Sequence, residues 1–356
     1  MHRFRLAGTP GSRLTRAGVA AAAIAAAVVL PNAASAATVS EANGVVTYQA
    51  APGEVNQVSP FVDGGFVKVR ENNSATPLAA GAGCRIVADH IAQCDGSGTR
   101  VLVNLGDRND TYFGTGAGFV PATVNGGDGD DLLIDGDGAG RREIYSGSNG
   151  NDTVTYALEK RPVSLSLDNA GNDGEAGEGD FIASDVENLT GSPQSDQLIG
   201  DGADNHLRGE GGNDRLSGLG GADTFDEGPT ASGADTISGG SGTDRVRYDE
   251  RTAAGVRVTL DGAADDGQAG EGDNVQPDVE NISGTRFADT LVGSELANSI
   301  LGLGGNDAIN PLAGSDRVFG GDGDDRINVR DGVRDFARGA AGNDTITRDT
   351  VDDAIG

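Results

Sequence analysis

Aspartate and glycine recur in this sequence with a period of nine residues. Rows such as GEGGNDRLS (209–217) and GGDGDDRIN (320–328) place Gly at positions 1 and 4, Asp at position 6 and an apolar residue at position 8. Glycine lacks a Cβ, so it permits positive φ and lets carbonyl oxygens approach a common point. Carbonyl and carboxylate oxygens are the ligands of Ca²⁺, whereas zinc and copper favour His and Cys. The spacing therefore predicts a series of calcium sites.

Position 6 of each row supplies the candidate metal ligands. Two single rows begin at Gly126 and Gly147, and two runs of rows begin at Gly191 and Gly284. The candidate ligands are Asp131, Asp152, Asp196, Asp214, Asp223, Asp235, Asp244, Asp289, Asp307, Asp316, Asp325 and Asp344. The leading rows of each run lack Gly at position 4. They are either metal-binding turns or plain coils that cap the run. The metal role of the single rows also stays open.

The rows resemble the G-G-x-G-x-D-x-U-x nonapeptide of RTX, or hemolysin-type, calcium-binding repeats, in which U is a large apolar residue. The resemblance covers most of residues 105–347. It implies an all-β fold in which six residues form a calcium-binding turn, three form a short strand, and successive turns coil into a parallel β-roll (a β-solenoid). It also implies two rows per coil, so that residues such as Asp196 and Asp214 share one site. Sites that include Asn205 or Asn298, which replace Asp at position 6, carry less charge and are predicted to be weaker.

The predicted core is small, and this makes the metal a part of the folding reaction. Each row offers one apolar residue at position 8, for example Leu216 or Ile327. Burial of that side chain has to offset the conformational entropy of nine ordered residues and the mutual repulsion of the aspartates. We therefore predict that the coils fold when several Ca²⁺ ions bind and are expanded when calcium is scarce.

A longer duplication is superimposed on the rows. Residues 163–191 match residues 256–284 at an offset of 93, with 16 of 29 positions identical. Each copy contains an acidic loop, NDGEAGEGD (172–180) or DDGQAGEGD (265–273). The two loops are either solvated insertions or additional calcium sites. In the second case the ligands are Asp173, Glu178 and Asp180 in the first copy and Asp266, Glu271 and Asp273 in the second.

The remaining segments divide the chain further. Residues 1–36 have a basic start, a 14-residue apolar run and a small-x-small site before Ala37, which predicts a cleaved signal peptide and export. Residues 37–104 alternate in the manner of half-buried strands and are predicted to form a small N-terminal β cap. Residues 105–248 and 249–347 are the two predicted repeat blocks, and residues 348–356 are a tail. In an exported chain, Cys84 and Cys94 are predicted to form a disulfide.

Composition limits the classes of function. The 55 acidic residues exceed the 26 basic ones and give a net charge of −29, which disfavours nucleic acid as a partner. After signal removal no segment could span a membrane. The motifs H-E-x-x-H and G-x-S-x-G and the phosphate-binding loop are absent from the sequence. We therefore predict a protein that is not an enzyme.

These observations favour a secreted, non-enzymatic calcium-binding protein. The alternative is a surface adhesin or matrix protein in which the roll is a rigid spacer and the cap of residues 37–104 binds an unknown cell-surface or matrix ligand. A secreted hydrolase with trailing repeats is a weaker alternative, because no segment before the rows is long enough or carries the motifs. The sequence does not indicate the biological role of the bound calcium.

Overall fold

The computed structural model describes residues 36–355 except 74, 96–99, 115–119 and 137–140. The predicted signal segment lies outside the described residues apart from Ala36, and the first strand, β1 (Ala37–Ala42), begins directly after the predicted cleavage site. Every regular element in the described part is a strand, and nearly all neighbouring strands beyond β8 pair in parallel. The all-β expectation is confirmed.

One long sheet contains a strand from almost every coil. Its pairing is parallel from β3 to β34, and only the hairpins at the β3–β4–β7–β6 end are antiparallel. In spatial order the long sheet consists of β34 (Asp353–Ile355), β32 (Phe336–Ala341), β30 (Arg317–Asp322), β28 (Ser299–Gly304), β26 (Asn281–Ser283), β23 (Arg245–Arg247), β21 (Thr224–Asp226), β19 (His206–Arg208), β17 (Asn188–Thr190), β13 (Thr153–Thr155), β11 (Leu132–Ile134), β9 (Thr111–Phe113), β3 (Gln57–Asp63), β4 (Phe66–Glu71), β7 (Ile91–Cys94) and β6 (Cys84–Ala88).

The other strand of each coil belongs to one of three shorter sheets. The N-terminal short sheet is ordered β16 (Phe181–Ile182), β12 (Ile144–Asn149), β10 (Ala122–Asp128), β8 (Arg100–Asp107), β2 (Val45–Gln49), β1 and β5 (Leu78–Ala80). The middle short sheet is ordered β15 (Gly174–Glu175), β14 (Val163–Ser166), β18 (Gln197–Ile199), β20 (Arg215–Gly221), β22 (Thr236–Gly242) and β25 (Asn274–Val275). The C-terminal short sheet is ordered β24 (Arg257–Thr259), β27 (Thr290–Val292), β29 (Ala308–Asn310), β31 (Arg326–Val329) and β33 (Thr345–Arg348).

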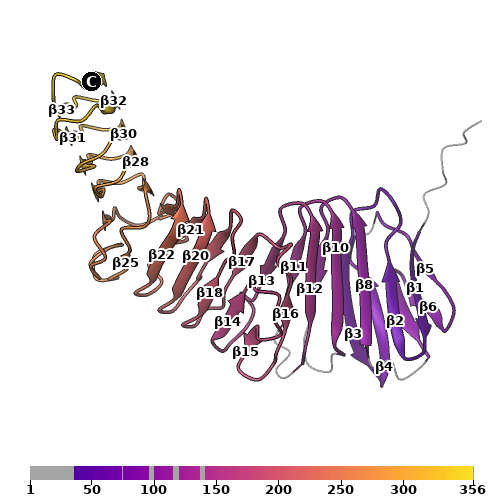
Figure 1. The fold of residues 1–356 in the computed structure, drawn as a ribbon. Coiled ribbons are helices and arrows are strands. Elements are labelled where there is room, and N and C mark those ends of the chain that lie inside the picture. Colours follow the sequence, from indigo (N-terminus) through magenta and orange to yellow (C-terminus); the bar gives the residue numbers. More distant parts are fainter. Residues whose placement is uncertain (1–35, 74, 96–99, 115–119, 137–140, 356) are drawn as a thin grey trace, which may run out of the picture. The chain divides into compact units, whose positions relative to one another are not determined.

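Two rows make one coil, as the resemblance implied. Leu198 pairs with Leu216 and Ile309 with Ile327, each 18 residues on, while the intervening row enters the long sheet. Figure 1 shows β18, β20 and β22 side by side in consecutive coils. The side chain at position 8 of each row packs inward, and all of them except the partly buried Ile346 are nearly fully buried, so they stack into one continuous core.

The two duplicated segments lie where one short sheet ends and the next begins. In the first, β14 starts the middle short sheet, the chain returns through the antiparallel strand β15, and β16 closes the N-terminal short sheet against β12. In the second, β24 starts the C-terminal short sheet and β25 closes the middle one against β22. We call these two places the first and the second junction. Each duplicated segment therefore ends one short sheet and begins the next.

Three sequence-based assignments change in the structure. The predicted boundary after residue 104 falls inside β8, whose parallel partners β2 and β10 lie on either side of it, so the sheets run from the cap into the rows without interruption. The predicted tail contributes β34, which pairs with β32. Residues 329–338 interrupt the nine-residue rows in the sequence but do not interrupt the long sheet, because β32 begins within them at Phe336. The predicted disulfide between Cys84 and Cys94 joins the paired strands β6 and β7.

Glycine at position 4 is required where successive turns stack. Gly323 has φ of +139°, and a Cβ built on it would lie 1.8 Å from the carbonyl oxygen of Gly305 in the neighbouring coil. We expect Gly323→Ala to destabilise the fold by at least about 1–3 kcal/mol, the typical cost of a strained backbone conformation. Thermal unfolding in saturating calcium measures the effect.

The matched control is Gly202→Ala. Gly202 has no atom within 4 Å of a built Cβ and no positive φ, so this change should leave the melting temperature nearly unaltered. Equal effects of the two substitutions would contradict the stacking argument.

Candidate metal centre

The position-6 residues of successive coils form two hydrogen-bonded ladders. In most coils the backbone N–H of the position-6 residue donates to the Oδ1 atom of the position-6 carboxylate in the next coil. The N–H of Asp196 donates to Asp214 at 2.8 Å, and that of Asp307 donates to Asp325 at 3.0 Å, both across 18 residues. The predicted pairing of position-6 residues in adjacent coils is thus present in the structure. A backbone donor, and not a second carboxylate, makes the direct contact.

The second oxygen of most ladder carboxylates is buried and accepts no hydrogen bond from the described residues. Of the twelve predicted ligands, the nine with such an Oδ2 atom are Asp131, Asp152, Asp214, Asp223, Asp244, Asp307, Asp316, Asp325 and Asp344. A buried carboxylate oxygen without a donor or a cation is costly. The single rows with Asp131 and Asp152 share this feature with the rows of the two runs.

Position 1 supplies further oxygens at the same place. A Cβ built on Gly302 would lie 2.3 Å from Asp307 Oδ2 and 2.4 Å from the carbonyl oxygen of Gly320 in the next coil. At Gly218 the corresponding distances to Asp223 Oδ2 and the Gly239 carbonyl oxygen are 1.9 Å and 2.7 Å. Oxygens from two coils therefore face a space that only glycine leaves open.

This donor set fits calcium. It consists of carboxylate and carbonyl oxygens, and no His or Cys occupies positions 1 to 6 of the rows. Ca²⁺ accepts six to eight oxygens in flexible geometry, whereas softer metals select nitrogen and sulfur. The nine carboxylates with an unpartnered oxygen are the residues that would hold it, and its charge would neutralise their buried negative charge.

The leading rows satisfy their own carboxylates. Both oxygens of Asp196 accept hydrogen bonds, from the N–H and hydroxyl of Ser192 and from the N–H of Val163. Asp289 is held in the same way by Thr285 and Val256. Both carboxylates belonged to the predicted ligand set. The structure gives them protein partners, which favours the alternative of capping coils for these two rows.

The asparagine side chains at position 6 also find their hydrogen-bond partners within the protein. Asn205 accepts the N–H of Asp201 through Oδ1 and donates from Nδ2 to the carbonyl oxygen of Glu187 at 3.2 Å. Asn298 does the same with Ser294 and with the carbonyl oxygen of Glu280. An amide at position 6 therefore completes the ladder without an added cation.

The ladders contain acids that the nonapeptide pattern did not reveal. Rows with altered glycines place Asp110, Glu187, Glu280, Asp335 and Asp352 at the same ladder position. The signal that could have found them is an acid two residues before a strand's inward side chain, as in Glu187 before Leu189. Without the glycines this signal is too common in an acidic chain to be selective.

Burial dominates the electrostatics of the ladders. Desolvation raises the pKa of Asp214 to about 8 and those of Asp307 and Asp316 to about 7, while the hydrogen bond from the preceding coil opposes the shift. The pKa of Asp131 is raised to about 6 by the same cause. In the absence of a cation these carboxylates therefore keep their protons to higher pH than free aspartate does.

The acidic loops are not solvated insertions. Asp173 accepts the N–H of Ser166 at 2.7 Å and that of Ile182 at 3.0 Å, so both of its oxygens fasten β14 and β16. Asp266 holds Thr259 and Val275 in the second copy in the same manner. These two candidate ligands of the loops therefore hold backbone groups in place.

Asp235, a predicted row ligand, lies within a group with Glu227 and Asp273 whose carboxylate oxygens are within 4.8 Å of one another.

Comparison with known proteins identifies the rows. A model of the RTX calcium-binding nonapeptide repeat matches the chain in four copies, over residues 190–225, 230–250, 283–318 and 312–333. No curated protein matches the chain. Within the part of the chain that the structure describes, no helix has the length and hydropathy of a membrane span. The predicted RTX-type repeats and the β-roll that they form are confirmed.

The raised pKa values determine how stability depends on pH in calcium-free buffer. Unfolded aspartate titrates near pH 4, whereas these folded carboxylates titrate between about pH 6 and 8. Their contribution is fully present below about pH 4 and is lost as pH rises through 6 to 8. We expect a stronger far-UV circular dichroism β signal at pH 5 than at pH 8.

Saturating calcium should remove this trend, because it binds the ionised carboxylates. A β signal that increases from pH 5 to pH 8 in calcium-free buffer would contradict the assignment of unpaired buried carboxylates.

Proposed function

We propose that this chain, an RTX-type calcium-binding repeat protein, is a secreted, non-enzymatic protein whose coils bind several calcium ions and fold on binding them. The observation that carries the proposal is the row of nine buried carboxylates that each leave one oxygen without a donor. Eight of them, all except Asp316, also lie beside the glycine at position 1 of their own row, as Asp307 lies beside Gly302. The ladder therefore supports cations as a structural part of the folded protein.

The same ladder explains why folding depends on the ion. Ladder carboxylates of adjacent coils repel one another, as Asp289 and Asp325 do at Asp307, and the chain has a net charge of −29. In water the aspartates of an expanded chain are separated and hydrated, whereas in the coil they are stacked and desolvated. Ions bound only by the coil stabilise it through linkage. Calcium concentration then controls the balance between the two states.

Secretion is supported by the sequence and by the position of the first strand. The predicted cleavage before Ala37 leaves the buried side chain of Ala37 at the start of β1. Extracellular calcium modules typically bind at about 10⁻⁴ to 10⁻³ M. We infer that the chain crosses the membrane expanded and coils where calcium is abundant.

The non-enzymatic part of the proposal rests on how the carboxylates are used. Each ladder carboxylate accepts a backbone N–H through one oxygen, which fixes its position in the coil. This arrangement suits a structural ligand, whereas a general acid or base needs freedom to exchange its proton with a substrate.

Calcium removal tests the proposal directly. At pH 7.5 we expect chelation to abolish most of the β signal in far-UV circular dichroism and to increase the radius of gyration in small-angle scattering. Readdition of calcium should restore both, and magnesium should do so only at higher concentration. A β signal and a radius that do not respond to chelation would refute calcium-dependent folding.

A pair of substitutions tests the ligand assignment. Asp307→Asn keeps an acceptor for the N–H of Asp289 but removes the buried anionic oxygen. We expect calorimetric titration to show one site weakened by about tenfold or more, equivalent to about 1.4 kcal/mol.

Asp196→Asn is the matched control. Both oxygens of Asp196 already have donors in the protein, so its loss of charge should leave calcium affinity and stoichiometry unchanged. A larger loss of calcium affinity in Asp196→Asn than in Asp307→Asn would reverse the assignment.

A further inference from the structure

The two junctions contain equivalent buried clusters that differ in charge. Six positions correspond between them. The pairs, first junction before second, are Asp135 and Glu227, Glu143 and Asp235, Glu159 and Arg251, Glu175 and Gln268, Glu178 and Glu271, and Asp180 and Asp273. The first cluster has six acids at these positions. The second has four acids, one amide and one arginine.

Hydrogen bonds establish the correspondence. Asp180 accepts the N–H of Glu143 at 2.7 Å and the Tyr156 hydroxyl at 2.9 Å. Asp273 likewise accepts the N–H of Asp235 at 3.1 Å and the Tyr248 hydroxyl at 3.0 Å.

The same backbone turn places Glu159 in the first cluster and Arg251 in the second. The N–H of Glu159 donates to the carbonyl oxygen of Tyr156 at 2.8 Å, and that of Arg251 donates to Tyr248 at 3.0 Å. Glu159 and Arg251 therefore start from the same point of the backbone and enter the same interior.

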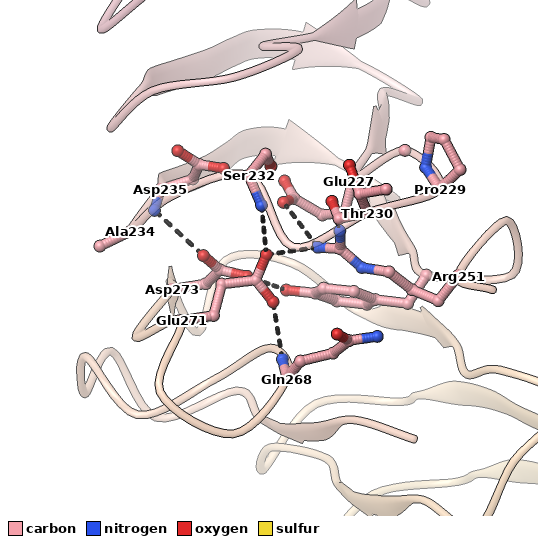
Figure 2. Close-up of polar contacts among 12 residues, drawn as sticks. Glu227, Pro229, Thr230, Ser232, Ala234, Asp235, Arg251, Gln268, Glu271 and Asp273 are labelled. Atoms are coloured by element: carbon pink, nitrogen blue, oxygen red, sulfur yellow. Dashed lines mark hydrogen bonds and ion pairs between the residues drawn. The ribbon is translucent and has the colours of Figure 1, made fainter. Parts of the chain in front are cut away.

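In the second cluster the arginine supplies the positive charge. Figure 2 shows the guanidinium of Arg251 between Glu227, Thr230 and Glu271. Its Nη2 atom lies 2.7 Å from Glu271 Oε1 and 3.7 Å from Glu227 Oε2, and the side chain is fully buried. Its guanidinium carbon lies 5.4 Å from the centre of the Tyr248 ring. A buried cation of the protein itself thus compensates these acids.

The first cluster has a glutamate at this point. Glu159 is 1% exposed, and neither of its carboxylate oxygens has a hydrogen-bond donor among the described residues. It interacts electrostatically with the carboxylates of Asp135, Glu175 and Glu178. The buried Glu175 is paired with the exposed Arg161, whereas Asp135 accepts the Tyr145 hydroxyl and contacts the carboxyl group of Glu143. An unpartnered, buried carboxylate therefore points into a group of other acids.

The acids are close enough together to share one ion. Oxygens of Asp135, Glu178 and Asp180 lie within 4.8 Å of one another. Their surroundings offer the hydroxyl groups of Tyr145 and Tyr156 as further oxygens, and no His or Cys is among the residues of the cluster. Hard oxygen donors in this number favour calcium over zinc or copper.

We propose that the first junction holds a divalent cation, calcium by its donor set, among Asp135, Glu159, Glu178 and Asp180, where the second junction holds the guanidinium of Arg251. This site is separate from the glycine-turn sites of the rows. The cation and the arginine are alternative solutions to the same buried charge, and each closes one short sheet against the start of the next.

Terbium luminescence provides a local test. The chain has five Tyr and no Trp, and Tyr145 and Tyr156 donate to carboxylates of the first cluster. Tb³⁺ binds calcium sites and emits under tyrosine excitation only when the ring is close. In the full chain, Glu159→Gln should remove most of the tyrosine-sensitised emission and lower the calorimetric calcium stoichiometry by one. Glu159→Arg, which copies the second junction, should do the same and keep the β signal.

Arg251→Gln is the matched control and should lower neither the emission nor the stoichiometry, because it leaves the acids of the first junction intact. Wild-type emission and stoichiometry in Glu159→Gln would show that Glu159 does not hold a cation and would overturn the proposal. Equal losses in Glu159→Gln and Arg251→Gln would overturn it as well, because a general loss of structure would then explain both. Calcium-induced folding of the rows is read separately by circular dichroism, so failure of this site is distinguishable from failure of the proposed function.

Discussion

The whole fold depends on one carboxylate contact that is repeated along the chain. The Oδ1 atom of a position-6 aspartate accepts the backbone N–H of the preceding coil, as between Asp214 and Asp196. This bond fixes the register of successive coils and at the same time brings the carboxylate into a desolvated interior. The second oxygen then needs a partner, and glycine at position 1 keeps the space beside it open. Coil stacking and cation binding are therefore consequences of the same side chain.

The same requirement explains the rows that depart from the pattern. At the start of each run, Ser192 and Thr285 donate to the position-6 carboxylate, and in the next row Asn205 and Asn298 replace it. At these coils the protein supplies the donors itself. The degenerate rows are thus ordered starting coils, on which coils with unpartnered oxygens can stack.

The sequence predicted the strands, the two-row coil and the ladder residues wherever the glycines are retained, because Gly at positions 1 and 4 is a direct demand of close stacking. It did not reveal the coils through Asp110, Glu187 or Asp335, since their turns tolerate other residues. Position 2 tolerates other residues also in the recognised rows, where Leu219 and Leu303 have positive φ. The junctions were equally hidden. Strands β14 and β16 are held together by hydrogen bonds from the backbone of Ser166 and Ile182 to Asp173, and no local pattern encodes these contacts.

The two junctions bury equivalent acids but differ in the group that compensates their negative charge. Both junctions retain the aspartate that closes the sheet, Asp180 or Asp273, and the tyrosine that donates to it. Only the residue three positions after that tyrosine changes sign, from Glu159 to Arg251. If these acids only held backbone groups in place, the second junction would not need a buried arginine where the first has Glu159. Its fully buried position indicates that a positive charge stabilises the junction, and this is the reason for proposing a bound cation in the copy that has a glutamate at that point.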